Sequence, residues 1–247
     1  MPIRSCLVCG TPRSGSSMLC GLLKSSGVAG RAEEYFWRGD EAFWAKRWDA
    51  SAPAESPWPD YLRAALSEGT TTNGVFAAKV MWGYFDDLLT NLATLPASSG
   101  LDAAQLLRRT FPDLRFVLIR RADTIAQAVS LARAHLTGVW YRPPGSEPGP
   151  EPDYDYDLID GLLRMVDEHN TAWLRWFDEH EIEPFTVTYE DLDADPAGVA
   201  RQVLTFLDVD PSSAQPITAQ TERQGTALNT TWIARYLAER RSRQATD

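Results

Sequence analysis

A glycine-containing turn near the start of the chain holds residue types that bind a phosphate or sulfate group. The turn, Thr11-Pro12-Arg13-Ser14-Gly15-Ser16-Ser17, separates an apolar run over residues 3–9 from a segment with apolar residues at helical spacing. The first amides of a helix lack partners within the helix, and the helix dipole favours an anion there. Arg13 can contact two oxygens of such a group, and the serines can add hydroxyl donors. The turn predicts an anion site; the alternative is an ordinary strand-to-helix turn.

The same turn differs from the loop with which many enzymes bind ATP. That loop carries a lysine directly before a Ser or Thr, so that the lysine reaches the terminal phosphates and the hydroxyl reaches Mg²⁺. Here no lysine precedes Ser16, and the cation is Arg13. The strand predicted at residues 114–119 runs into Arg120-Arg121, whereas magnesium-dependent enzymes of this topology place an aspartate at a strand end. The sequence therefore favours an anion site that uses no metal.

Arg121 and Ser130 form a second candidate for anion binding. Arg121 follows a buried strand, at the position where open α/β sheets bind their ligands. Ser130 lies in the helix predicted at residues 124–136, which returns along the sheet. Both side chains reach one phosphate only if the chain turns back sharply after Arg121. The alternative is a surface arginine and an unrelated helix serine.

Strands that alternate with helices predict an α/β fold with a central, mainly parallel β-sheet flanked by helices. No internal repeat or domain boundary is visible, so residues 1–247 are expected to form a single domain. The predicted strands are 3–9, 75–82, 114–119 and 183–188. One predicted helix begins at Ser16, and the others span residues 36–48, 60–66, 85–95, 101–110, 124–136, 158–180, 196–207 and 231–241. Surface connections are predicted at 51–59 and 143–152.

Composition limits the classes of function. Hydrophobic residues make up 44% and charged residues 23% of the chain, as in ordinary soluble proteins, and no apolar run approaches the ~18 residues of a membrane span. The formal net charge of −10 argues against a nucleic-acid surface. The cysteines, Cys6, Cys9 and Cys20, lack zinc-site spacing; Cys6 and Cys20 are expected to be buried as small apolar residues. A cytoplasmic protein is the default expectation.

Several motifs, in this order, resemble those of sulfotransferases that use PAPS (3′-phosphoadenosine-5′-phosphosulfate). Residues 11–17 resemble the loop that binds the 5′-phosphosulfate, and residues 120–130 the motif that binds the 3′-phosphate. Tyr189-Glu190-Asp191-Leu192 resembles a late strand-helix unit of the same proteins. Residues 27–36, 79–82, 127–134 and 222–224 with Trp232 are similar, more narrowly, to the bacterial trehalose 2-sulfotransferase type. The resemblance covers most of the chain.

The resemblance implies a P-loop-like sulfotransferase fold, PAPS as sulfuryl donor, PAP as product, and a hydroxyl acceptor such as a sugar. It also implies a homodimer. The glutamate ahead of an aromatic pair, here Glu34 before Tyr35-Phe36, would be the general base, because the acceptor hydroxyl must lose its proton as it attacks sulfur. Glu33 is the less favoured neighbour. Arg13 would neutralise the departing phosphate, and the remaining nucleotide-binding residues would be Thr11, Ser14, Gly15, Ser16, Ser17, Arg121, Ser130, Arg223 and Gln224.

Other candidates face the acceptor. Lys79 could help to neutralise the departing phosphate or could simply extend from a strand end into solvent. Trp82 and Trp140 could stack on a sugar or pack in the core, and Tyr35 would join them at the acceptor. The acceptor-facing stretches, 51–75 and 141–155, depart from the trehalose type. A P-loop-like nucleotide kinase or NTPase, and a nucleotide-binding module without turnover, remain alternative functions.

Overall fold

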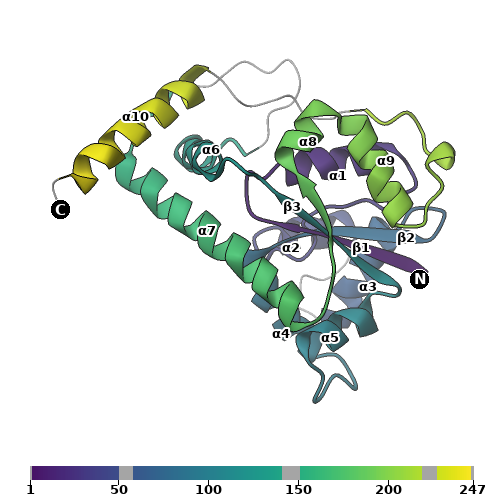
Figure 1. Ribbon diagram of the computed structural model, residues 1–247. Helices are drawn as coiled ribbons and strands as arrows, with labels where there is room; N and C mark the ends of the chain where they lie inside the picture. Colours follow the sequence, from purple (N-terminus) through teal and green to yellow (C-terminus); the bar gives the residue numbers. More distant parts are fainter. Residues whose placement is uncertain (1, 50–57, 141–150, 219–226, 246–247) are drawn as a thin grey trace.

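The computed structural model describes residues 2–49, 58–140, 151–218 and 227–245 (Figure 1). Within these ranges the chain forms one parallel sheet of four strands in the order β2-β1-β3-β4. The strands are β1 (Arg4–Gly10), β2 (Val75–Met81), β3 (Leu114–Arg120) and β4 (Phe185–Thr188). Because the strands run in the same direction, their carboxyl ends share one edge of the sheet, where ligands of such folds bind.

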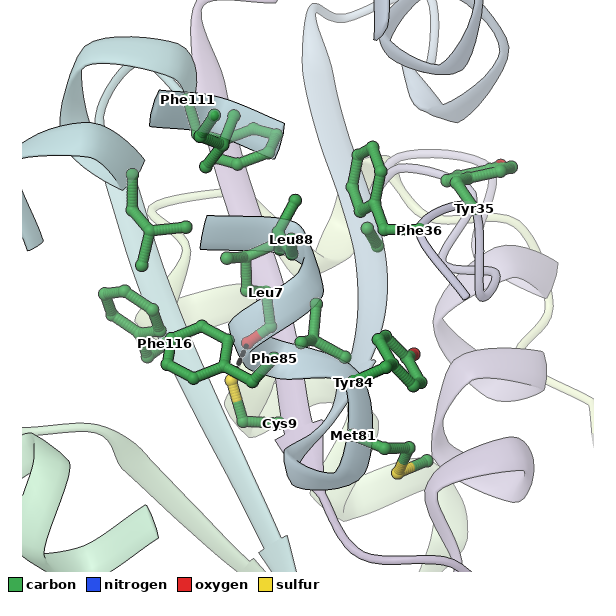
Figure 2. Packing of buried hydrophobic residues seen from close by; sticks show 14 of the residues in the cluster. Leu7, Cys9, Tyr35, Phe36, Met81, Tyr84, Phe85, Leu88, Phe111 and Phe116 are labelled. Atoms are coloured by element: carbon green, nitrogen blue, oxygen red, sulfur yellow. Dashed lines mark hydrogen bonds between the residues drawn. The ribbon is translucent and has the colours of Figure 1, made fainter. Parts of the chain in front are cut away.

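The central strands are apolar on both faces, as expected for a parallel sheet covered by helices on both sides. Side chains alternate along β1: Leu7 and Cys9 belong to one hydrophobic cluster, and Cys6 and Val8 to another on the opposite face. The first cluster is rich in aromatic side chains, and Figure 2 shows Phe85 and Phe116 packed beside Leu7 and Cys9. The thiols of Cys6 and Cys20 are buried, as predicted.

Helices cover both faces of the sheet (Figure 1). The face with Cys6 and Val8 packs against α1 (Ser16–Ser25), α8 (Tyr189–Ala194) and α9 (Pro196–Phe206). The other face packs against α3 (Trp58–Gly69), α4 (Phe85–Ala93), α5 (Ala103–Thr110) and α7 (Tyr156–Glu179). A third cluster joins α6 (Thr124–Thr137) to α7 and α10 (Ala227–Gln244). The remaining elements are α2 (Glu41–Arg47) and the short 3₁₀ turns η1 (Trp82–Tyr84) and η2 (Pro211–Ser213).

The long helix α7 is anchored to the sheet next to the predicted anion site. The indole nitrogen of Trp173 donates a hydrogen bond of 2.8 Å to the carbonyl oxygen of Gly10, the last residue of β1. The Trp173 ring is fully buried and lies against Phe85 and Phe177. This hydrogen bond satisfies a buried carbonyl and fixes the point at which the chain leaves β1 for the turn.

The predicted alternation of strands and helices is confirmed, with some corrections at the boundaries. Of residues 36–48, which were predicted as one helix, only α2 is helical, because Gly39 and Asp40 favour a turn before α2. The connection predicted at 51–59 overlaps α3, which begins at Trp58, and the last helix begins at Ala227 instead of residue 231. The short α8 was not predicted. Within the described ranges, no helix combines the length and apolarity needed to cross a bilayer.

The loop that carries Glu34 is packed tightly on β2 at Gly30. Gly30 has φ of +78°, and a Cβ atom there would lie 2.6 Å from the Cβ of Ala77. Gly100 has the same φ but no atom within 4 Å of a Cβ. Backbone strain alone costs about 1–2 kcal/mol, and forced overpacking adds roughly 1–3 kcal/mol. Gly30→Ala is therefore expected to lower the free energy of unfolding clearly more than Gly100→Ala, measured by urea denaturation. Equal losses would contradict the packing.

Candidate active site

The turn between β1 and α1 has the backbone geometry of an anion-binding loop. Gly15, the residue before α1, has φ of +93°, and no side chain caps the helix. A Cβ atom at Gly15 would lie 2.7 Å from Cδ2 of Tyr189, so both the backbone and the neighbouring ring require glycine there. Ser16 and Ser17 begin the helix, and their backbone amides point out of its N-terminus without intrahelical partners. These amides are suited to hold oxygens of a phosphate or sulfate.

Two distant helices hold the turn in place through Thr11. The Thr11 hydroxyl donates to Oδ1 of Asn170 at 3.2 Å and accepts from Nε2 of Gln127 at 2.8 Å. Gln127 also donates to the carbonyl oxygen of Pro12 at 2.7 Å. Thr11 is fully buried and its hydroxyl is used inside the protein; its contact with a cofactor stays a prediction. The buried hydroxyl of Ser14 has no hydrogen-bond partner in the described part of the chain.

The structure brings Arg13, Arg121 and Ser130 together. Nε of Arg13 donates to the hydroxyl of Ser130 at 3.1 Å, although the two residues lie on different elements. Burial lowers the pKa of Arg13, and the positive charges of Arg121 and Arg133 lower it further. Like charges held close together out of water stabilise an anion that binds between them. The two predicted anion sites therefore join into one group, here called the basic cluster, which consists of Arg13, Arg121, Ser130 and Arg133.

The basic cluster is supported from α8. The guanidinium carbon of Arg121 lies 4.5 Å from the ring centroid of Tyr189, the same ring that packs on Gly15. Glu190 accepts hydrogen bonds from the backbone amides of Ala122 and Asp123 at 3.2 and 3.4 Å, which fixes the chain just after Arg121. Nε of Arg121 is buried and has no hydrogen-bond partner among the described residues. An anion oxygen would satisfy this donor.

Glu34 lies beside the anion loop and is connected to it by Lys79. Nζ of Lys79 is 3.0 Å from Oε2 of Glu34 and 3.2 Å from the hydroxyl of Ser17. Burial acts to lower the pKa of Lys79, but the Glu34 carboxylate, with Cys20 and Glu33, outweighs burial and raises the pKa. Lys79 is therefore a cation paired with Glu34, and not a strand-end lysine that extends into solvent. The Glu34 side chain remains 27% exposed, so a substrate can reach it.

The remaining predicted residues are placed as follows. Tyr35 is 1% exposed and donates through its hydroxyl to the carbonyl oxygen of Arg31, so its burial argues against the predicted contact with an acceptor. Trp82 is partly buried, with its ring centroid 5.0 Å from that of Trp173. Trp140 is 49% exposed, and its carbonyl oxygen accepts a 2.7 Å hydrogen bond from Arg13. Arg223 and Gln224 lie outside the described residues.

The site also contains residues that were not predicted from the sequence. Arg133 lies one turn after Ser130 on α6, a spacing that places both on one helix face and could have identified it. Tyr189 belongs to a motif that was recognised, but its contact with both Gly15 and Arg121 depends on the tertiary fold. The role of Gln127 likewise depends on how α6 packs against the turn.

A parallel sheet with a glycine turn and clustered arginines at its carboxyl edge is the arrangement typical of proteins that bind phosphate- or sulfate-bearing ligands. The family model described as Stf0 sulphotransferase matches residues 5–239, so the chain belongs to this sulfotransferase family. Two curated relatives are the trehalose 2-sulfotransferases of Mycobacterium tuberculosis (strain ATCC 35801 / TMC 107 / Erdman) and Mycolicibacterium smegmatis (strain ATCC 700084 / mc(2)155). Each is 29% identical to this chain; the alignments cover 96% and 93%, respectively, of both chains.

Solved structures show the same fold. The sulfotransferase domain of the curacin biosynthetic pathway matches with a TM-score of 0.51 and 17% identity, over 94% of this chain and 83% of that one. The sulfotransferase domain of the Synechococcus PCC 7002 olefin synthase matches with a TM-score of 0.51 and 16% identity, over 96% and 95%. The predicted P-loop-like sulfotransferase fold is confirmed.

The basic cluster is expected to bind pyrophosphate and thereby raise the melting temperature. Arg121→Gln removes one charged donor, and hydrogen bonds to charged groups contribute about 1.5–3 kcal/mol, so pyrophosphate should bind this variant at least about tenfold more weakly. Arg109→Gln is the matched control, because Arg109 is exposed at the end of α5 and bonds the carbonyl oxygen of Pro96. A thermal-shift titration measures both variants. Identical titrations would show that the cluster does not hold the anion.

Proposed function

We propose that this sulfotransferase moves a sulfuryl group from PAPS to a hydroxyl of a sugar, with Glu34 as the general base. The observation that carries the proposal is the position of Glu34: Lys79 contacts both its carboxylate and the hydroxyl of Ser17 in the anion loop. A carboxylate beside the helix N-terminus that would hold the phosphosulfate supports this role. The trehalose 2-sulfotransferases among the relatives support a sugar as the acceptor class.

The reaction is a single in-line displacement. Glu34 takes the proton of the acceptor hydroxyl while that oxygen forms a bond to sulfur. The bond from sulfur to the 5′-phosphate oxygen breaks, and PAP leaves with the electron pair. Arg13, Lys79 and the first amides of α1 stabilise the negative charge that grows on the departing phosphate.

The part of the basic cluster other than Arg13 is suited to the second phosphate of the donor. Arg121 and Ser130 would hold the 3′-phosphate, with Arg133 as an additional cation nearby. The buried Nε of Arg121, which has no hydrogen-bond partner among the described residues, fits a ligand that supplies acceptor oxygens at this point. Arginine suits this role because its guanidinium group can contact two oxygens of one phosphate.

The glutamate assignment is tested by a pair of neighbouring substitutions. Glu34→Gln keeps size and shape but cannot accept the proton, so it should lower kcat by about 10²–10⁴ while the affinity for PAP stays unchanged. Glu33→Gln is the matched control, because Glu33 instead pairs with Lys24 at 2.6 Å on the surface. Transfer from labelled PAPS to trehalose and other sugars measures kcat, and calorimetry measures PAP binding. Wild-type activity in Glu34→Gln would remove the assignment.

The donor is tested by binding in the presence of a chelator. PAP at about a hundredfold excess over its Kd should add about 3 kcal/mol to stability, and EDTA should not alter this gain because the proposed site uses no metal. Stabilisation by ATP that requires Mg²⁺, without any by PAP, would favour the rival interpretation of a nucleotide kinase. PAP binding without sulfuryl transfer in any variant would favour a binding module.

A further inference from the structure

The hydroxyl of Tyr84 lies beside the proposed base, and the mechanism above gives it no role. The hydroxyl is 3.3 Å from Oε1 of Glu34 and 3.0 Å from the carbonyl oxygen of Lys79. A hydroxyl group has a single proton to donate, so it serves one of these two acceptors at a time. Tyr84 is the last residue of η1, the turn that directly follows β2. The position of its ring is thus set by the same strand that carries Lys79.

Each oxygen of the Glu34 carboxylate lies within reach of a donor. Lys79 contacts Oε2, and Tyr84 contacts Oε1. The Tyr84 ring is buried in the aromatic-rich cluster, where Figure 2 shows it near Met81, so the ring has little freedom to turn away. Burial raises the pKa of Tyr84 well above its ordinary value, and the nearby Glu34 charge raises it further. The hydroxyl consequently keeps its proton and acts as a donor.

We propose that Tyr84 is a positioning residue for the base, which holds Oε1 of ionised Glu34 and turns to the Lys79 carbonyl oxygen after Glu34 takes the acceptor's proton. This inference rests on the proposed role of Glu34. The ionised carboxylate is the stronger acceptor, so it holds the Tyr84 proton before the reaction. A protonated Glu34 is a weaker acceptor, and the Lys79 carbonyl oxygen then provides an alternative at 3.0 Å. Tyr84 acts through Glu34 and does not touch the reacting atoms.

A double-mutant cycle separates positioning from a structural role. Wild type, Glu34→Gln, Tyr84→Phe and the double variant are compared with PAPS and trehalose, and with glucose and maltose as further acceptors. Loss of one hydrogen bond to the base should lower kcat about tenfold in Tyr84→Phe, with the PAPS KM unchanged. In the Glu34→Gln background the same substitution should have no further effect, because no base remains to be oriented.

Tyr236→Phe is the matched control. Tyr236 is also fully buried, and its hydroxyl donates to a carboxylate, Oδ1 of Asp160, at 2.8 Å in the cluster between α7 and α10. Its loss should leave kcat at the wild-type value. Melting temperature and PAP affinity are measured for every variant, since Tyr84→Phe keeps the ring and should preserve both.

The outcomes are distinguishable. Wild-type kcat in Tyr84→Phe, an equal loss in both backgrounds, or loss of PAP binding in Tyr84→Phe would each overturn the positioning role while leaving the proposed function intact. Full activity in Glu34→Gln would remove the proposed base and this inference with it. Failure of the wild type to sulfate any of the sugars would contradict the proposed acceptor class, and this inference with it.

Discussion

The site depends on partly buried arginines that the parallel sheet brings together at the carboxyl ends of neighbouring strands. Arg13 follows β1 and Arg121 follows β3, and their strands are neighbours in the sheet. Burial and the positive charges of Arg121 and Arg133 lower the pKa of Arg13. An anion bound beside these groups would favour their charged forms, which agrees with the proposed role of the cluster.

Elements far apart in the sequence hold this cluster and the anion loop in one geometry. From α6, Gln127 braces the loop at Thr11; from α7, Trp173 bonds the last residue of β1. From α8, Tyr189 packs between Gly15 and Arg121. These contacts within the protein hold the donors in fixed positions, and fixed donors are the condition for strong electrostatic stabilisation of an anion.

The sequence predicted what local patterns determine and missed what depends on tertiary packing. Apolar runs and a glycine turn gave the strands and the anion loop, and parallel strands implied that Arg13 and Arg121 meet at one edge. The difference between the partly exposed Glu34 and the buried Tyr35, which was predicted at the acceptor, likewise depends on how their loop packs. No local signal shows that the Tyr84 hydroxyl would reach Glu34, because that contact requires the loop to be packed on β2.

The edge strand β2 determines where the proposed base stands. The loop that carries Glu34 lies along this strand: Gly30 packs against Ala77, and the amide of Lys79 donates to the carbonyl oxygen of Glu33 at 2.9 Å. The loop thereby covers part of an exposed sheet edge and takes its register from the strand. Since β2 pairs with β1, which leads into the anion loop, the separation between Glu34 and this loop is set by strand pairing. In-line transfer requires such a fixed separation, and a rigid sheet provides it better than two mobile loops could.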